Sequence, residues 1–301
     1  MNGTTYNQIV IFHAIVSEGR ITQAARKLGL KPPSVSQALK ALEKQVGLPL
    51  FSRTTRRIEL TEAGQILYDR TLKVMAELDS ALENVRDLSE VPSGKVSLTL
   101  PRFAYQYWFA TIYAEFCRRY PSIQLEISIS DASVNIISAG FDMGIRFGDR
   151  VDEGMVARQL TPPMQEAIFV SPGYAEKFGL PDSLEALQSH RLIQYRFISS
   201  NQLAPLKLDD AGQVTTVDMP IALIVNDTDL MVDAALKGLG VGRIVTPVVA
   251  DYFEHKQLIP LFPEKWYRYP GLYVYFQQNT QKAKRVRVLI DFLIEKAVQE
   301  A

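Results

Sequence analysis

The first residues of the chain repeat short apolar patterns separated by glycines. Ile9, Phe12 and Val16 lie three to four positions apart within residues 6–16, the spacing of one face of an amphipathic helix. Gly19 follows and ends the pattern. We therefore predict a first helix that packs through a single apolar face.

Two further helices are predicted in the next stretch. A short one runs from Thr22, its expected N-cap, to Leu28, and Gly29 ends it. Another begins at Pro32, because a missing N–H costs nothing in a first helical turn. Gly47 closes this helix. Its expected apolar face recurs at helical spacing and comprises Val35, Leu39, Leu42 and Val46.

A basic hairpin follows the helices. Phe51 lies in an expected strand, residues 53–57 form a polar turn, and residues 58–60 alternate as the return strand. Two helices joined at a glycine and followed by a hairpin are typical of a winged helix-turn-helix, whose second helix enters the major groove. We predict an all-α winged helix-turn-helix domain over residues 1–61, with the helix-turn-helix at about 21–40.

A long helix is predicted from residue 62 to about 89, with Thr61 as its cap. Apolar residues recur along this helix at seven-residue spacing and form a stripe. Stripes of this kind more often pack into a core, but no neighbouring helical sequence is available to cover this one. We therefore expect residues 62–91 to be a linker helix through which the chain forms a homodimer. Two seven-residue series define the seam, namely Tyr68, Met75 and Leu82, and Thr71, Leu78 and Val85.

Strand and helix patterns alternate after Pro92-Ser93-Gly94. This alternation predicts an α/β architecture with largely parallel sheets, and its length favours two lobes. The expected strands are residues 96–100, 123–129, 142–147, 155–160 and 165–170, and the expected helices are residues 107–119, 132–139, 229–238 and 281–299.

The charge is unevenly distributed although the 301 residues carry 33 basic and 33 acidic side chains. Residues 1–61 hold nine Lys or Arg and three Asp or Glu, a net charge of +6. The remainder therefore carries −6. Because phosphate affinity depends on local cation density, the basic head favours a nucleic-acid partner, whereas the overall neutrality does not.

The composition indicates an ordinary globular protein, with 47% hydrophobic and 22% charged residues. The single cysteine, Cys117, excludes an intrachain disulfide and fits a reducing compartment. The apolar run Ile9–Val16 is too short to span a bilayer, and no secretory signal is visible. We expect a cytoplasmic protein with no membrane partner.

Several segments of the chain follow one another in a recognisable order and spacing. Within residues 1–61 and the start of the long helix they are Phe12–Val16, Thr22–Leu28, Val35-Ser36, Leu42-Glu43, Gly47–Arg53 and Leu60–Gly64. Further along they are Pro92–Gly94, Gly140–Arg146 and Ala234–Gly240. These segments resemble LysR-type transcriptional regulators, densely over residues 6–64 and more weakly beyond.

The resemblance implies a sequence-specific transcriptional regulator controlled by a small-molecule effector. It implies that residues 92–301 form a two-lobed α/β effector-binding domain of the periplasmic-binding-protein type. Lobe I would comprise about 92–162 and 267–301, and lobe II about 163–266. The resemblance also implies a homotetramer, built as a dimer of dimers.

Double-stranded DNA is the expected partner of the head. Gln, Lys and Ser side chains on the solvent side of the third helix suit base edges, and wing arginines suit phosphates or a narrow minor groove. The predicted DNA-binding residues are Thr22, Gln23, Arg26, Lys31, Pro32, Ser34, Ser36, Gln37, Lys40, Arg53, Arg56 and Arg57.

The effector is expected at the carboxyl ends of strands, where open α/β units bind ligands. Strand ends place Pro101, Arg102, Phe103, Ser130, Asp131, Arg146 and Phe147 there, and the resemblance adds Thr161, Phe197, Asn226 and Thr246. Arg102 and Arg146 together favour an anionic effector. Alternatively, either arginine forms an internal ion pair, for instance with Asp131 or Asp149.

No catalytic or metal-binding constellation emerges. His13, His190 and His255 are dispersed, and one cysteine excludes a multi-cysteine zinc site. Gly238-Leu-Gly240-Val-Gly242 does not fit the dinucleotide-binding pattern. We expect no enzyme, cofactor or metal. Two alternatives are a cytoplasmic solute-binding module whose head serves only assembly, and an enzyme with its site between the lobes.

Overall fold

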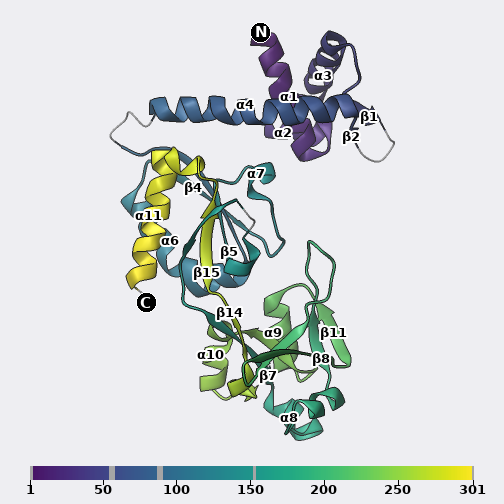
Figure 1. Cartoon of the computed structure of the whole chain (residues 1–301), viewed down its shortest axis with the longest axis vertical. Coiled ribbons are helices and arrows are strands. Elements are labelled where there is room, and N and C mark those ends of the chain that lie inside the picture. Colours follow the sequence, from purple (N-terminus) through teal and green to yellow (C-terminus); the bar gives the residue numbers. More distant parts are fainter. Residues whose placement is uncertain (1–2, 54–57, 87–90, 152–153, 300–301) are drawn as a thin grey trace. The chain divides into compact units, whose positions relative to one another are not determined.

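The protein, seen as a computed structural model, divides into two compact units, residues 1–89 and 90–301 (Figure 1). None of the helices in the described part of the chain is long and apolar enough to cross a membrane. The described residues are 3–53, 58–86, 91–151 and 154–299.

Three helices build the core of the first unit. Phe12 and Ile15 of the first helix are fully buried, as is Val35 of the third, and Leu42 is 2% exposed. The helical head predicted from the apolar spacing is therefore confirmed. The helices are α1 (Gly3–Glu18), α2 (Ile21–Lys27) and α3 (Pro32–Val46).

Two details of the predicted helices are wrong. α2 begins at Ile21, and Arg20 rather than Thr22 is its N-cap, because the Ile21 side chain packs against the core and joins the first turn. Val46, expected on the buried face of α3, is 43% exposed. It is the last residue of α3, and Gly47 then turns the chain into the left-handed region with a φ of 80°.

The expected wing is an antiparallel hairpin of β1 (Phe51–Arg53) and β2 (Ile58–Leu60). Phe51 pairs with Leu60, and Phe51 reaches into the core of the unit. The tip between the strands, residues 54–57, lies outside the described residues. The described part of the wing therefore confirms the hairpin.

The long helix is α4 (Glu62–Arg86), and the last residues of its expected span lie outside the described part. Thr61 caps it as predicted, since the Thr61 Oγ1 accepts a hydrogen bond of 3.1 Å from the Gly64 N–H. At Gly64 the helix approaches the backbone so closely that a Cβ would lie 2.1 Å from the Leu50 carbonyl oxygen. This contact requires glycine.

The first half of the expected α4 seam is covered within the unit, which corrects the premise that no helix is available to cover it. Tyr68 and Met75 pack against the core built by α1 to α3. The Thr71 Oγ1 lies 2.6 Å from the His13 Nε2 of α1. The uncovered stripe is therefore shorter and comprises Val74, Leu78, Leu82 and Val85, which are 41 to 66% exposed.

Lobe I of the second unit is a five-stranded sheet with the order β4-β3-β5-β15-β6. Helices α6 (Ala110–Arg119) and α11 (Lys284–Gln299) contact each other through the rings of Phe116 and Phe292. The strands are β3 (Gly94–Leu100), β4 (Ile123–Ile129), β5 (Met143–Phe147), β6 (Val156–Gln159) and β15 (Leu272–Phe276).

Lobe II is built around β7, which pairs with β12, β13 and β14. β8 and β11 form a parallel pair, and β9 and β10 a hairpin. The strands are β7 (Met164–Val170), β8 (Leu192–Tyr195), β9 (Leu206–Asp210), β10 (Gln213–Val217), β11 (Ile221–Val225), β12 (Gly242–Val245), β13 (Ile259–Leu261) and β14 (Tyr267–Tyr269). The helices are α8 (Pro172–Phe178), α9 (Thr228–Leu236) and α10 (Thr246–Glu254).

The expectation of largely parallel sheets is wrong. Among the described strand pairs, parallel pairing is confined to β3 with β4, β3 with β5, and β8 with β11. The chain leaves lobe I after β6 and returns as β15, which enters between β5 and β6 and runs antiparallel to both. β7 likewise receives three antiparallel partners.

Two predicted helices have different bounds. The helix expected at 107–119 starts earlier, with α5 (Arg102–Ala104) and a π-helical turn (Tyr105–Phe109) leading into α6. The helix expected at 132–139 is reduced to α7 (Ile136–Ala139), because the Asn135 side chain accepts hydrogen bonds from two N–H groups and caps the helix there.

Candidate functional site

A polar surface covers the solvent side of α3 and the turn before it. Lys31, Pro32, Ser34, Gln37 and Lys40 are exposed. They alternate with Val35 and Leu39, which are buried, so the helix presents one polar and one apolar face. Ser36, also predicted to contact DNA, is half-buried.

Three cations of this surface are unneutralised. Arg26, Lys31 and Lys40 are exposed and make no ion pair with any residue in the described ranges. An unpaired exposed cation can neutralise a phosphate without first breaking an internal contact. Thr22 and Gln23 of α2 are exposed beside them.

The wing residues are only partly described. Arg53 is the last residue of β1, so its backbone is placed by the hairpin. Arg56 and Arg57 lie outside the described residues. Their expected role in phosphate or minor-groove contact stays a prediction.

A cavity of about 270 Å³ lies between the two lobes of the second unit. Six of the predicted effector residues line it: Pro101, Phe103, Asp131, Arg146, Phe147 and Phe197. The first five follow or end β3, β4 and β5, whose carboxyl ends meet at one edge of the lobe I sheet. The strand ends of lobe I therefore bring these five side chains together, as predicted.

The other five predicted effector residues do not line the cavity. The Arg102 Nε lies 3.6 Å from the Asp227 Oδ2 and 3.8 Å from the Asp229 Oδ2. The Thr161 Oγ1 accepts a 2.8 Å bond from the Leu272 N–H, where β15 re-enters lobe I. Ser130, Asn226 and Thr246 complete this group.

Arg146 lines the cavity with a guanidinium held by backbone carbonyls. It donates to the carbonyl oxygens of Ile145, Ser130 and Ala132 at 2.8, 3.1 and 3.1 Å. It is 8% exposed and pairs with no carboxylate of the described residues. Burial lowers the pKa of this guanidinium. The alternative of an internal ion pair is confirmed for Arg102, whose partners are Asp227 and Asp229 rather than Asp131 or Asp149. Arg146 forms no such pair with a described carboxylate and remains a buried positive charge at the cavity wall.

Lobe II contributes a buried charge pair that is not among the residues predicted from the sequence. The Arg243 Nη1 lies 3.8 Å from the Glu166 Oε2, and their side chains are 3% and 11% exposed. Arg243 also donates to the carbonyl oxygens of Pro205 and Ala204, at 2.7 and 2.8 Å. Burial raises the pKa of the Glu166 carboxyl, and Arg243 opposes this effect. Each of these residues is the one charged residue of a largely apolar strand, and this pattern was the sequence signal that could have indicated them.

Other missed cavity residues come from both lobes. Thr228 is the first residue of α9, Tyr195 ends β8, and Tyr269 ends β14. Arg150 of lobe I lies with its guanidinium 4.9 Å from the centre of the Phe197 ring of lobe II. These residues follow no common sequence pattern, because the two lobes bring together positions far apart in the chain.

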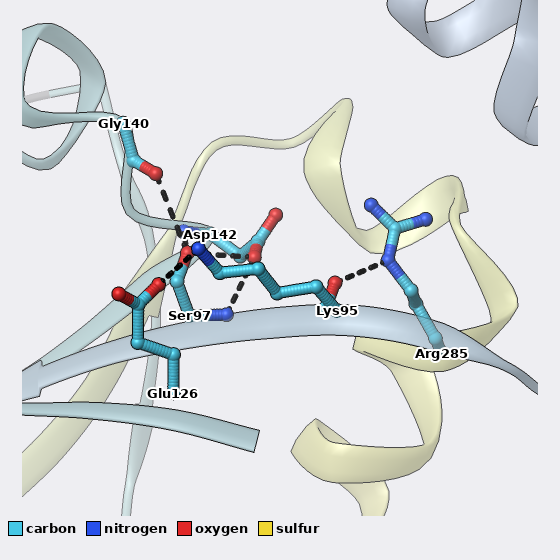
Figure 2. A network of polar contacts seen from close by, with 6 residues as sticks. All are labelled: Lys95, Ser97, Glu126, Gly140, Asp142 and Arg285. Atoms are coloured by element: carbon cyan, nitrogen blue, oxygen red, sulfur yellow. Dashed lines mark hydrogen bonds and ion pairs between the residues drawn. The ribbon is translucent and has the colours of Figure 1, made fainter. Parts of the chain in front are cut away.

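A polar network at the opposite end of β3 fixes the lobe I strands (Figure 2). The Asp142 Oδ2 accepts from the Ser97 N–H at 2.7 Å and from the Ser97 hydroxyl at 2.8 Å. The Arg285 Nε of α11 donates to the Lys95 carbonyl oxygen at 2.6 Å. Because Asp142 directly precedes β5, the network sets β5 against β3, and both strands then deliver residues to the cavity.

We expect Asp142→Ala to lower the free energy of unfolding of the second unit by about 2–3 kcal/mol, because two buried donors of Ser97 lose a charged acceptor. Burial raises the pKa of the Asp142 carboxyl above its ordinary value, and the Ser97 hydrogen bonds offset part of this rise. Urea unfolding would measure the change. Glu126→Gln, in an exposed pair with Lys95, is the control and should change little. Equal effects of the two changes would contradict the structural role of Asp142.

Comparisons with known proteins identify the family of both parts of the chain. Residues 6–65 match the family of bacterial regulatory helix-turn-helix proteins of the lysR family, and residues 89–298 match the LysR substrate binding domain. The transcriptional regulator PtxR of Pseudomonas aeruginosa is 30% identical over 98% of this chain and 94% of its own. PgrR of Escherichia coli is 28% identical over 95% of each chain.

Solved structures show the same architecture. CrgA, a LysR-type transcriptional regulator of Neisseria meningitidis, is 26% identical with a TM-score of 0.60 over 99% of each chain. The full-length structure of AphB, a Vibrio cholerae virulence activator, has a TM-score of 0.68 over 96% of this chain and 98% of its own, at 21% identity.

The winged helix-turn-helix and the two-lobed α/β domain together define a DNA-binding transcriptional regulator with an effector-binding domain. The chain belongs to the family of LysR-type transcriptional regulators. The families and relatives it matches are transcriptional regulators rather than enzymes.

Proposed function

We propose that the exposed polar side of α3 reads DNA bases while the interlobe cavity binds a small anionic effector. The observation that carries the DNA-binding part is the set of unpaired cations and polar side chains on one face of α3. Buried Arg146, a positive charge with only carbonyl partners, carries the effector part. We assign residues 1–61 to DNA binding, 62–91 to assembly and 92–301 to effector binding, in a protein that acts in the cytoplasm.

We propose that a pair of α3 helices, one from each of two copies of the chain, contacts the DNA bases. Two such helices related by a twofold axis would meet consecutive major grooves roughly 34–36 Å apart. The exposed apolar stripe of α4 supports this pairing. We propose that two dimers assemble into a tetramer, as the family resemblance implies.

The proposed switch is a shift between arrangements of the two lobes. Contacts from both sides of the cavity cross between them: the Ser133 N–H of lobe I donates to the Ser199 Oγ of lobe II at 2.6 Å. A ligand that binds one arrangement better than another moves the equilibrium by its differential affinity. The DNA-binding geometry of the assembly then changes with it.

We expect Gln37→Ala to relax specificity at one base position of the operator. Gln37 is exposed on α3, and a glutamine amide can form two hydrogen bonds to the edge of adenine. Removing it should weaken the binding free energy by about 1–3 kcal/mol for operators that carry the preferred base, and leave binding to the other operators unchanged. Binding titrations with operator variants, each altered at one position, measure this. Gln65→Ala, at an exposed position of α4, is the matched control. Unchanged discrimination at every position would remove Gln37 from the reading surface.

A thermal-shift screen of the full chain against carboxylate and phosphate metabolites tests the anionic effector. The proposal predicts that at least one such anion raises the melting temperature. Stabilisation only by uncharged or cationic metabolites would contradict it.

A further inference from the structure

The interlobe cavity contains buried polar atoms without hydrogen-bond partners. They are the Thr228 Oγ1, the Glu166 Oε2 and the Arg243 Nε, and all three residues line the cavity. Nearly every buried polar group in a native protein has a partner, and leaving one without costs about 1–3 kcal/mol. Because all three atoms belong to residues that line one cavity, a ligand that reached them there would supply the missing hydrogen bonds.

The two protein acceptors restrict the ligand. The Glu166 Oε2 lies 3.8 Å from the Arg243 Nη1, beyond hydrogen-bond distance, so its lone pairs are available to a donor. The Thr228 hydroxyl, in a residue 8% exposed, can donate as well as accept. The lobe II wall thus suits a ligand group that is itself both donor and acceptor, such as a hydroxyl.

The charges at the wall add a second requirement. Three guanidinium groups line the cavity, those of Arg146, Arg150 and Arg243. Arg150 lies 4.0 Å from the Asp149 carboxylate, and Arg243 lies 3.8 Å from the Glu166 carboxylate. Arg146 is the buried cation of this set that lacks a carboxylate partner among the described residues. A ligand with one negative charge would balance it.

Aromatic rings provide the third requirement. Phe103 and Phe147 are stacked with ring centres 5.0 Å apart, and Phe147 and Tyr269 with centres 4.9 Å apart. Tyr195 and Phe197 meet edge to face on the lobe II side, at 5.7 Å. Rings on both sides of a cavity of about 270 Å³ favour a small flat ligand that stacks or meets them edge-on.

We infer that the effector is a small aromatic monocarboxylate with a hydroxyl group on its ring. Its ring lies among the aromatic side chains, its carboxylate compensates Arg146, and its hydroxyl bonds Glu166 and Thr228. This inference rests on the proposed effector role of the cavity and adds the chemical class of the ligand.

Calorimetric titration of the full chain with a graded series tests each requirement. The probes are meta- and para-hydroxybenzoate, benzoate, cyclohexanecarboxylate and succinate. We expect one hydroxybenzoate to bind at least about tenfold more tightly than benzoate, the effect of one buried hydrogen bond. Benzoate should in turn bind more tightly than cyclohexanecarboxylate, whose ring is not flat.

Two variants place the binding in this cavity. Thr228→Val keeps the side-chain shape and removes a hydroxyl that has no partner, so the fold should not be weakened while the preference for hydroxybenzoate over benzoate falls. Phe147→Leu should reduce the preference for benzoate over cyclohexanecarboxylate. Thr216→Val, at an exposed position of β10, is the control and should leave all affinities unchanged.

The results distinguish the inferred ligand class from the proposal that the cavity binds an anionic effector. Binding of succinate without binding of any aromatic acid would overturn the aromatic class and leave an anionic effector in place. Full hydroxybenzoate preference in Thr228→Val would overturn the assignment of the hydroxyl contact. If no acid of the series binds, the ligand class inferred here is wrong, and the wider metabolite screen then decides whether any anion is the effector.

Discussion

The double change Leu78→Asp and Leu82→Asp is expected to convert the protein to monomers and to weaken operator binding by about 10²–10⁴. Both leucines lie on the uncovered stripe of α4, at 41% and 53% exposure. Carboxylates there would have to be desolvated in a helix pair, which costs more than the apolar contact returns. In a dimer, binding of the first DNA-binding unit holds the second near its half-site at a high effective concentration. A monomer loses this advantage.

Sedimentation velocity and a DNA titration on the same samples measure this expectation. Leu78→Ile with Leu82→Ile keeps the apolar stripe and should remain dimeric with nearly unchanged affinity. If the aspartate variant stayed dimeric and bound operator like the parent protein, α4 would not be the dimer contact, and the pairing of the two heads would lie elsewhere.

Gly64→Ala is expected to destabilise the DNA-binding unit by about 3 kcal/mol and so to reduce DNA binding strongly. A Cβ at this position would lie 2.1 Å from the Leu50 carbonyl oxygen and 2.9 Å from the Leu60 side chain. The backbone of either α4 or the wing must therefore move, and overpacking of this kind costs about 1–3 kcal/mol or more. The shift would also displace the wing, since Leu60 belongs to β2.

Thermal unfolding followed by circular dichroism, together with a DNA titration, checks the glycine requirement. Gly3→Ala is the matched control, because nothing lies within 4 Å of a Cβ there and alanine favours a helix. The control should be neutral or slightly stabilising. Equal melting temperatures for the two variants would show that the contact between α4 and Leu50 tolerates a side chain.

The head was predictable because its local signals agree with its packing. The apolar spacing of Phe12 and Val35 matches their complete burial, and Thr61 caps α4 as its residue type suggests. The errors arise where tertiary contact decides. Ile21 joins α2 because the core receives its side chain, and Tyr68 is covered by a core that no local pattern reveals.

The second unit was less predictable because its chain crosses between lobes. A strand such as β15 returns from lobe II, and no local signal shows that it pairs antiparallel with β5 and β6. The expected strand ends predicted Arg146 and Phe147 as cavity residues. Glu166 and Arg243 also line the cavity but lie inside strands, so this rule does not predict them. Their presence as charges in apolar strands was a usable sign, although only the structure shows that they face one cavity.

Footprinting the full protein on the DNA that flanks its own coding sequence, over a range of salt concentrations, measures whether α3 reads a DNA sequence. We expect two protected major-groove segments separated by about one helical turn, 10–10.5 base pairs, or a multiple of it. Protection should weaken steeply with salt and be lost in Gln37→Ala with Lys40→Ala. Protection that survives this double change, or duplex binding without any preferred segment, would contradict sequence reading by the exposed face of α3.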